Sequence, residues 1–471
     1  MVLVLTVVIL QSISFSNYAL TTKTTNIIYG SAPYLTFDGG RTRVTNTEAL
    51  LGISLSDGRK FTPATNNSRD NPIILPVDGQ SFNDIGMLVP TDTDSIALSS
   101  LIGTPYNYWG DDDGDGQGID GVTATGSLNL SIVDRFSRAV ARNKVLDICN
   151  APYRLTLSNS EGILKTRYGV PNESRFTAGN ATYYINPKAA PVICYARPAS
   201  HLDSSANWSR GLSAAVWVPS WGFVPQSVTP SSYGLNFPTT GANGLYFDLD
   251  IGGGSQALSW APVSHGGITA TMYDSTRGGV RVTLKGPVAR GFTNPGRVNR
   301  PSLPQTFELV GRDSSGNAVV KYGFVLKQWF IASYTSKTIA ISFDDALSWC
   351  NKTGYRLPKV RDLTNASSCN GGTCRNGHSS NIYEFPGGAT PSSPDWYLRR
   401  HIGAGFFTEW GDMSYYGGNF NQRYPGYYSS ELTSDGRYAF TVRLPEGYSG
   451  VSRKMNTYPV YIGFGMLCVY P

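Results

Sequence analysis

Short runs in which apolar and polar residues alternate recur along the chain, and turn residues close most of them. Clear examples are residues 126–133, 152–158, 246–251, 279–284 and 305–310. Because successive side chains of a strand point to opposite faces, each run predicts a strand with one buried and one solvated face. The 52 glycines and 28 prolines supply the turns that many short strands need. The pattern predicts a mainly β protein with a β-sandwich-type region.

Helical patterns occur in two places. Residues 133–147 carry a weak apolar stripe with the spacing of one helix face. Residues 343–350 carry a stronger stripe, with acids near its start and Gly354 after its end, as helix termini favour. Pro358 then opens a second helical pattern over residues 359–366. The C-terminal part of the chain is therefore predicted to be a small α+β domain.

The length of 471 residues exceeds what one ordinary core supports, so we expect two or three domains. Glycine, proline and arginine cluster between Val288 and Pro304, and such clusters are typical of domain boundaries. We therefore expect residues 20–300 to form one or two sandwich-like units, and residues 301–471 to form another domain. The net charge of +6 is spread thinly, so no nucleic-acid partner is indicated.

The chain begins with an uncharged apolar run that is shorter than a membrane span. Residues 1–19 are predicted to be a secretory signal peptide; the alternative is a mis-set start codon that exposes a buried strand. Six cysteines in an exported protein favour disulfides over thiols. Cys369 and Cys374 flank a flexible turn, and a bond between Cys149 and Cys194 would close a loop of 45 residues. These are two of the predicted pairs.

The last third of the chain carries short motifs in a fixed order. They are Trp349-Cys350, Gly354 to Pro358, Arg361 to Asn365, Phe406 to Gly411 and a final Cys468. In this order they resemble the C-type-lectin-like domain that ends adhesins of the enterobacterial intimin/invasin type. The resemblance implies a disulfide between Cys350 and Cys468, because the first helix and the last strand of lectin-like domains are joined in this way.

A second resemblance covers the earlier part of the chain. Residues 37–40 and 108–116, with the chain up to Cys149, resemble the adhesion domain that precedes the lectin-like domain in these adhesins. The two resemblances together imply a β-rich adhesion region over residues 20–300 and a C-type-lectin-like domain over residues 301–471. They imply a bacterial surface or secreted adhesin that binds a host-cell surface protein or glycan through its C-terminal domain. An outer-membrane anchor or barrel is expected to lie outside this chain.

An acidic stretch, residues 111–120, places carboxylates at alternate positions between glycines. A hard cation takes six to eight oxygen ligands, and like charges this close together repel unless they are neutralised. The stretch predicts a structural calcium site with Asp111, Asp113, Asp115 and Asp120 as ligands. The alternative is a solvated acidic turn, because the stretch lacks the last glutamate and the flanking helices of an EF-hand.

Residues 410–428 are dense in tyrosine, glycine and asparagine, the composition of adaptable recognition loops. Six tyrosines and phenylalanines in this stretch exceed what one small core absorbs, so some are expected to face solvent. The predicted receptor-binding residues are Asp412, Tyr415, Tyr416, Phe420 and Arg423. Trp410 is interpreted as a core residue, and for Asp412 the alternative role of a turn former stays open.

Catalysis has little support, because nucleophile-elbow, metalloprotease, phosphate-binding and dinucleotide-binding motifs are absent. No catalytic residue is predicted, and calcium is the single cofactor considered. Two alternatives to an adhesin stay open. Glu409-Trp410 resembles part of the formylglycine-generating, sulfatase-modifying relatives of the lectin-like fold, which use a reactive cysteine pair. The other alternative is a calcium-stabilised glycan-binding protein, although the sugar-binding motifs of calcium-dependent lectins are absent.

Overall fold

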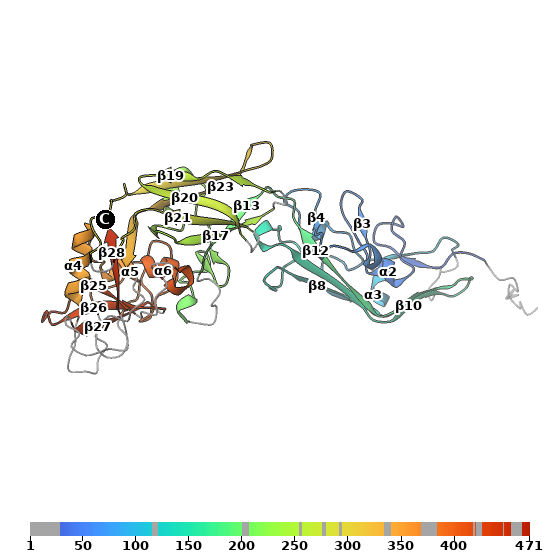
Figure 1. The fold of residues 1–471 in the computed structure, drawn as a ribbon. Coiled ribbons are helices and arrows are strands. Elements are labelled where there is room, and N and C mark those ends of the chain that lie inside the picture. Colours follow the sequence, from blue (N-terminus) through green and yellow to red (C-terminus); the bar gives the residue numbers. More distant parts are fainter. Residues whose placement is uncertain are drawn as a thin grey trace, which may run out of the picture. The chain divides into compact units, whose positions relative to one another are not determined.

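The chain folds into two compact units, Met1–Lys188 and Ala189–Pro471. The computed structural model describes residues 29–114, 121–199, 207–253, 257–275, 279–291, 294–333, 341–368, 384–417, 420, 426–445, 447–453 and 464–471. Figure 1 shows that strands dominate both units, which confirms the predicted mainly β architecture. The predicted signal peptide, residues 1–19, lies outside the described residues.

The first unit consists of short strands and of helices of about one turn. In chain order its elements, with η for a 3-10 helix, are β1 (Tyr34–Leu35), α2 (Thr47–Leu50), β2 (Ile53–Ser54), β3 (Lys60–Phe61), η1 (Pro63–Thr65), β4 (Ile73–Ile74), η2 (Phe82–Asp84), β5 (Ser95–Ala97), α3 (Leu98–Leu101), β6 (Trp109–Gly110), β7 (Val122–Thr125), β8 (Ser127–Val133), η3 (Ile148–Asn150), β9 (Tyr153–Asn159), β10 (Gly162–Thr166), β11 (Glu173–Phe176) and β12 (Gly179–Asn186).

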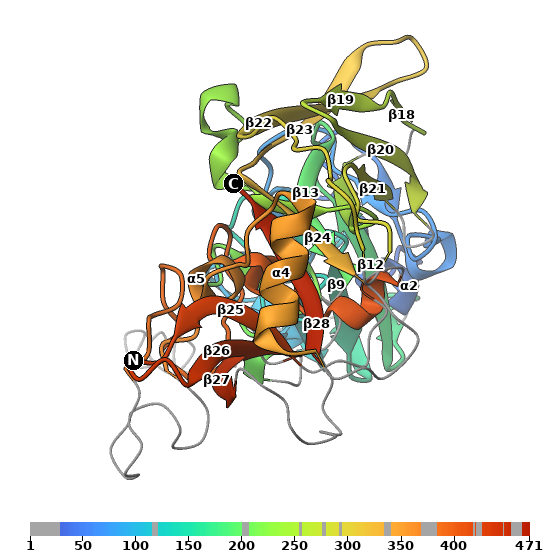
Figure 2. The same ribbon diagram turned by 60° about the vertical axis from the view of Figure 1, so that its left-hand side comes forward.

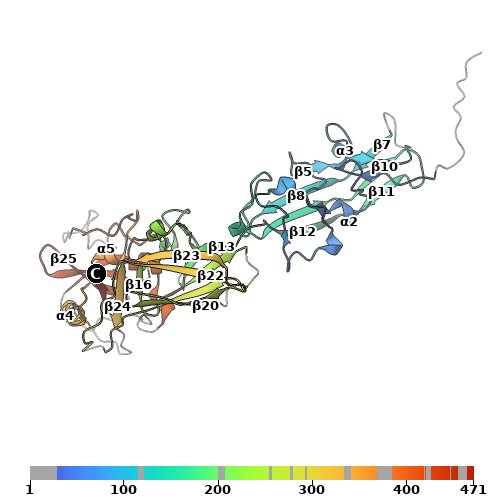
Figure 3. The ribbon, with the colours of Figure 1, turned by 90° about the horizontal axis from the view of Figure 1, so that it is seen from above.

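A five-stranded sheet with the strand order β4-β12-β9-β8-β5 forms the centre of the first unit. The central strand β9 runs antiparallel to both of its neighbours, β8 and β12, whereas β4 pairs with β12 in parallel. Figure 3 shows β8 and β12 of this sheet. In β9, Tyr153, Leu155 and Leu157 are at most 1% exposed, whereas the residues between them are half-buried. The strands predicted over 126–133 and 152–158 are thus confirmed as β8 and β9.

The helix predicted over residues 133–147 is wrong, because the chain makes a tight turn where β8 ends. Asp134 accepts hydrogen bonds from the N–H groups of Phe136 and Arg138 with the same oxygen, both at 2.9 Å. Ser137 takes a left-handed conformation with φ of 62°. A short polar side chain that bonds to nearby backbone N–H groups competes with helix formation. The weak apolar stripe in this segment does not outweigh that competition.

The second unit contains longer strands and three α-helices among its described residues. Its elements are β13 (Val192–Pro198), η5 (Asn207–Ser209), β14 (Trp217–Val218), β15 (Gly222–Phe223), η6 (Pro230–Leu235), β16 (Thr240–Ala242), β17 (Tyr246–Gly252), β18 (Ser259–Trp260), β19 (Val263–His265), β20 (Ile268–Ser275), β21 (Gly279–Lys285), β22 (Gln305–Arg312), β23 (Ala318–Leu326), β24 (Gln328–Ser333), α4 (Phe343–Thr353), α5 (Val360–Leu363), α6 (Phe406–Trp410), η7 (Met413–Tyr416), β25 (Gly426–Leu432), β26 (Tyr438–Arg443), β27 (Tyr448–Arg453) and β28 (Phe464–Tyr470).

One hydrophobic core joins the sheets of the second unit. The sheets have the orders β14-β15-β13-β17-β21-β20-β19, β18-β22-β23 and β16-β24-β28-β25-β26-β27. Phe247 of the first sheet is fully buried, and its ring lies 5.9 Å from that of Phe324 and 6.3 Å from that of Trp410. Aromatic rings at such distances contribute more stability than the burial of their apolar surface alone would give.

The residues at both ends of helix α4 favour the observed start and end of the helix. The Ser342 hydroxyl accepts a hydrogen bond from the Asp345 N–H at 3.1 Å, and the Asp345 carboxylate accepts one from the Ser342 N–H at 3.0 Å. This reciprocal pair is a capping box. Gly354 ends the helix with a φ of 83°, which only glycine adopts readily. The second helix predicted in this region, over 359–366, is the shorter α5.

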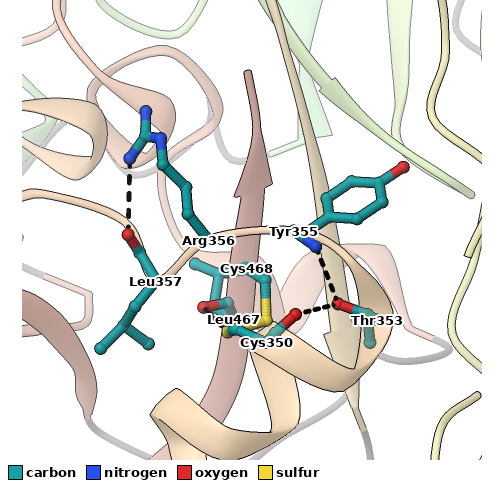
Figure 4. The surroundings of a disulfide bond; sticks show 7 residues. All are labelled: Cys350, Thr353, Tyr355, Arg356, Leu357, Leu467 and Cys468. Atoms are coloured by element: carbon teal, nitrogen blue, oxygen red, sulfur yellow. Dashed lines mark hydrogen bonds between the residues drawn. A yellow bond between two sulfur atoms is a disulfide. The ribbon is translucent and has the colours of Figure 1, made fainter. Parts of the chain in front are cut away.

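The disulfide between Cys350 and Cys468 joins α4 to the last strand, β28. Figure 4 shows both cysteines where the helix crosses the strand, with the Thr353 hydroxyl donating to the carbonyl oxygen of Cys350 at 2.6 Å. The N–H of Tyr355 donates to the same hydroxyl at 3.3 Å, so the chain leaves the helix in a fixed direction. The pairing implied by the resemblance is confirmed. Figure 2 shows α4 lying in front of β24 and β28.

The domain boundary predicted near residue 300 falls inside the second unit, and the observed division follows Lys188. The segments on either side of residue 300 share one core, and β16 pairs in parallel with β24 across that position. The turn residues of 288–304 therefore belong to a connection within a unit. Turn composition alone does not show whether the cores on its two sides are separate.

Candidate functional site

The stretch predicted to bind a receptor begins with the single turn η7. Asp412 precedes it and accepts a hydrogen bond from the N–H of Ser414 at 2.9 Å, so Asp412 caps the turn. Its role as a turn former is confirmed. Within η7, Tyr415 is 50% exposed and Tyr416 is 9% exposed. The turn therefore presents Tyr415 outward and Tyr416 inward.

Two of the predicted receptor-binding residues, Tyr416 and Phe420, are buried, which contradicts their prediction as exposed contact residues. The Tyr416 hydroxyl donates to the carbonyl oxygen of Trp410 at 3.0 Å and accepts from the N–H of Ala199 at 3.1 Å. Phe420 is 3% exposed, and its ring lies 6.1 Å from that of Phe406. The core absorbs these rings because residues before position 300 contribute to it. Trp410 is fully buried, which confirms its interpretation as a core residue.

A row of polar side chains lies on the face of β17, β21 and β20 opposite to that of Phe247 and Val282, and Asp248 in this row is 3% exposed. The register places Asp248 opposite Arg281, and Arg281 opposite Tyr273. Arg281 donates to the two carboxylate oxygens of Asp248 at 2.7 and 3.0 Å, and its guanidinium lies 4.2 Å from the centre of the Tyr246 ring. The hydrogen bond to Asp248 raises the pKa of Arg281. The bidentate pair and the stacked ring hold this arginine in one orientation.

Tyr246 connects this sheet face to the turn η7, since its hydroxyl donates to the carbonyl oxygen of Tyr415 at 3.2 Å. Four side chains thus form a continuous row, in which each contacts the next or lies opposite it in the register. We call this row the tyrosine–arginine surface; its members are Tyr415, Tyr246, Arg281 and Tyr273. Its two ends are open, because Tyr415 is 50% and Tyr273 52% exposed. Arg423, which was predicted to bind a receptor, lies outside the described residues.

Three of these four residues were not predicted to form a site. The alternation of apolar and polar residues predicts the strands β17 and β21 and assigns Tyr246 and Arg281 to their solvated faces. Tyr273 lies on β20, which pairs with β21. The alternation was the available signal, because it assigns these side chains to outward faces. It does not show which outward face lies beside the C-terminal turn.

Glu409 belongs to the Glu409-Trp410 pair that resembles part of the formylglycine-generating enzymes. Its carboxylate is fully buried and accepts hydrogen bonds from the N–H and hydroxyl groups of Thr239 and Thr240 and from the N–H of Gly403. The distances lie between 2.6 and 3.1 Å. A carboxylate with five donors and no solvent exposure holds segments together. It is not placed to meet a substrate.

The described part of the acidic stretch contacts cationic and polar groups of the same unit. Asp113 accepts a hydrogen bond from the N–H of Ser31 at 2.7 Å. Asp112 forms an ion pair with Arg43 and accepts a hydrogen bond from the Tyr34 hydroxyl at 3.1 Å. These contacts offset part of the repulsion between the carboxylates.

The calcium site stays a prediction, because two of its four ligands, Asp115 and Asp120, lie outside the described residues. Among the described residues no group of three or more acidic, histidine or cysteine side chains could hold a metal ion.

If Asp111 and Asp113 are calcium ligands, the melting temperature of the protein should be ~2–4 °C higher in millimolar calcium than in chelator. Magnesium at equal ionic strength is the control. Identical melting curves in calcium and chelator would support a solvated acidic turn instead.

The remaining predicted cysteine pairs are less completely described. Cys149 and Cys194 are both disulfide-bonded, and their mutual pairing stays a prediction. Cys369 and Cys374 lie outside the described residues. No free cysteine occurs in the described part of the chain, so the reactive thiols of a formylglycine-generating enzyme are not found there.

Comparison with known proteins gives structural matches only. No protein-family model matches the chain, and no curated protein matches it. The chain is similar to an EHEC O157:H7 intimin mutant at 15% identity and a TM-score of 0.28, over 50% of this chain and 89% of that one. A C-terminal 282-residue fragment of intimin, solved with the intimin-binding domain of the translocated intimin receptor, matches at 12% identity and a TM-score of 0.30, over 76% of this chain and 90% of that one.

Both of these solved structures are of intimin. Among the described residues, no helix is both long and apolar enough to cross a bilayer.

Proposed function

We propose that this protein is an exported adhesin that binds a protein receptor on the surface of a host cell through its second unit. The observation that carries the proposal is the tyrosine–arginine surface. Tyrosine and arginine are enriched in the hot spots of protein interfaces. Tyrosine offers a large amphipathic contact area while losing little conformational entropy. Two exposed tyrosines, Tyr273 and Tyr415, flank an arginine that Asp248 holds in place.

The side chains of the tyrosine–arginine surface are held in place by hydrogen bonds, which favours recognition of a partner. Arg281 is held by two hydrogen bonds and one ring, and Tyr415 belongs to a turn that Asp412 caps. Side chains that are already ordered lose less entropy when a partner binds, so more of the contact energy contributes to affinity. The resemblance of the motifs to intimin/invasin-type adhesins and the predicted signal peptide support a place at the cell surface or outside the cell.

Tyr415→Ala is expected to weaken binding to cultured epithelial cells about 30-fold, because truncating a hot-spot anchor costs on the order of 2 kcal/mol. The backbone carbonyl that accepts the hydrogen bond from Tyr246 is retained in this variant, so the turn should persist. The full chain is labelled, and its binding is titrated by flow cytometry and on a glycan array.

Tyr168→Ala is the matched control, since Tyr168 is 56% exposed and lies in the first unit. This variant should bind as the parent chain does. Tyr273→Ala, at the other end of the surface, should weaken binding as Tyr415→Ala does. Parent-like binding by both surface variants would refute the proposed contact surface, and binding to glycans alone would favour the glycan-binding alternative.

A further inference from the structure

The first unit contains a cavity of about 200 Å³ between the β2–β3 hairpin, α2 and the segment that follows β1. Its floor is apolar, because Val44, Ile53 and Leu88 line it and are at most 3% exposed. Two aromatic side chains, Phe37 and Phe61, also line the cavity and are half-buried. The cavity is thus an apolar space with aromatic walls. Figure 1 shows β3 and α2 in this unit.

Lys60 lies on the polar side of the cavity and forms no ion pair in the described part of the chain. Lys60 lines the cavity, is exposed, and donates to the Thr42 hydroxyl at 3.0 Å. The other lining cation, Arg43, already pairs with Asp112. Asp38, which interacts electrostatically with Lys60, does not line the cavity, and its oxygens accept hydrogen bonds from Thr36 and Thr42. The ammonium group is therefore available to a ligand.

The volume limits the ligand to a small group. A cavity of about 150 Å³ lined by apolar side chains binds benzene, so a cavity of 200 Å³ takes one ring with a short chain. Burial of one ring in an apolar site gains about 25 cal/mol for each Å² removed from water. A carboxylate on the short chain would lie beside the Lys60 ammonium group.

We propose that this cavity binds an apolar ring or branched group that carries a carboxylate. Two sources supply such a group: a free arylalkanoic acid, or the C-terminal residue of a peptide. The site is independent of the tyrosine–arginine surface, which belongs to the other unit. It would give the first unit a ligand of its own.

The test titrates the full chain with 3-phenylpropionate and with its neutral amide, using ligand-observed NMR. The acid should bind in the millimolar range, and two- to fivefold more tightly than the amide, which is the contribution of an exposed charge pair. Lys60→Met should abolish this difference while the amide still binds. The tripeptide Gly-Gly-Phe with a free or an amidated C-terminus distinguishes a peptide from a small acid as the source.

A space-filling variant tests the location. Ala49→Leu places a larger side chain against the cavity, which Ala49 lines, and should reduce binding of both ligands at least tenfold. Ala64→Leu is the matched control, because Ala64 is exposed and does not line the cavity. Nuclear Overhauser contacts from the ligand to the rings of Phe37 and Phe61 test the location in the parent chain, whether or not Ala49→Leu folds. Failure of both ligands to bind at 10 mM, roughly the weakest affinity expected of such fragments, would overturn the proposal. So would equal binding of acid and amide, or contacts to other residues.

Discussion

Replacing Glu409 with glutamine is expected to lower the free energy of unfolding of the second unit by about 3–5 kcal/mol. The Glu409 carboxylate is fully buried and accepts hydrogen bonds from five donors. An amide turns an NH₂ group toward some of these donors and leaves them without an acceptor. A buried donor without a partner costs more than the lost bond contributes. Four of the five donors belong to Thr239 and Thr240, about 170 positions earlier in the chain, so the two segments would separate more readily.

Urea unfolding followed by tryptophan fluorescence measures this effect. Eight of the nine tryptophans lie beyond residue 189, so fluorescence follows mainly the second unit. The matched control is Glu384→Gln, because Glu384 is exposed in the same unit and its replacement should change stability by less than about 0.5 kcal/mol. If Glu409→Gln unfolds at the same urea concentration as this control, the carboxylate is not the link between the segments.

The double variant Cys350→Ala, Cys468→Ala is expected to lose about 5 kcal/mol of unfolding free energy, because the disulfide closes a long loop in the unfolded chain. The cysteines are 118 positions apart, and the chain-entropy model relates stabilisation to the logarithm of that number. The disulfide also fixes α4 against β28, so its loss should loosen the helix first. The measurement is the same urea titration, without reductant.

The parent chain in reductant serves as the comparison for this variant. It should lose at least as much stability as the double variant, since reduction also opens any other disulfide. A double variant that unfolds within about 1 kcal/mol of the oxidised parent would show that the unfolded chain is already compact around this loop.

The sequence by itself determined the local elements of this protein. The alternating runs predicted β8, β9, β17, β21 and β22 nearly at their observed bounds, because a period of two defines a half-buried strand without reference to the rest of the chain. Residues 343–354 likewise predicted α4, since acids in the first turn and a terminal glycine act within one helix turn. The motif order led to the Cys350–Cys468 disulfide by resemblance and not by local physics.

The tertiary structure decided which outward and inward faces meet. Tyr416 and Phe420 resemble recognition residues in the sequence, but they are buried by partners far away in the chain. The same packing brings Tyr246, on whose ring Arg281 stacks, beside Tyr415, which no local pattern indicated. It also merges both sides of residue 300 into one core. Local preferences depend on neighbours within a few residues, whereas burial depends on long-range contacts that form once the chain has folded.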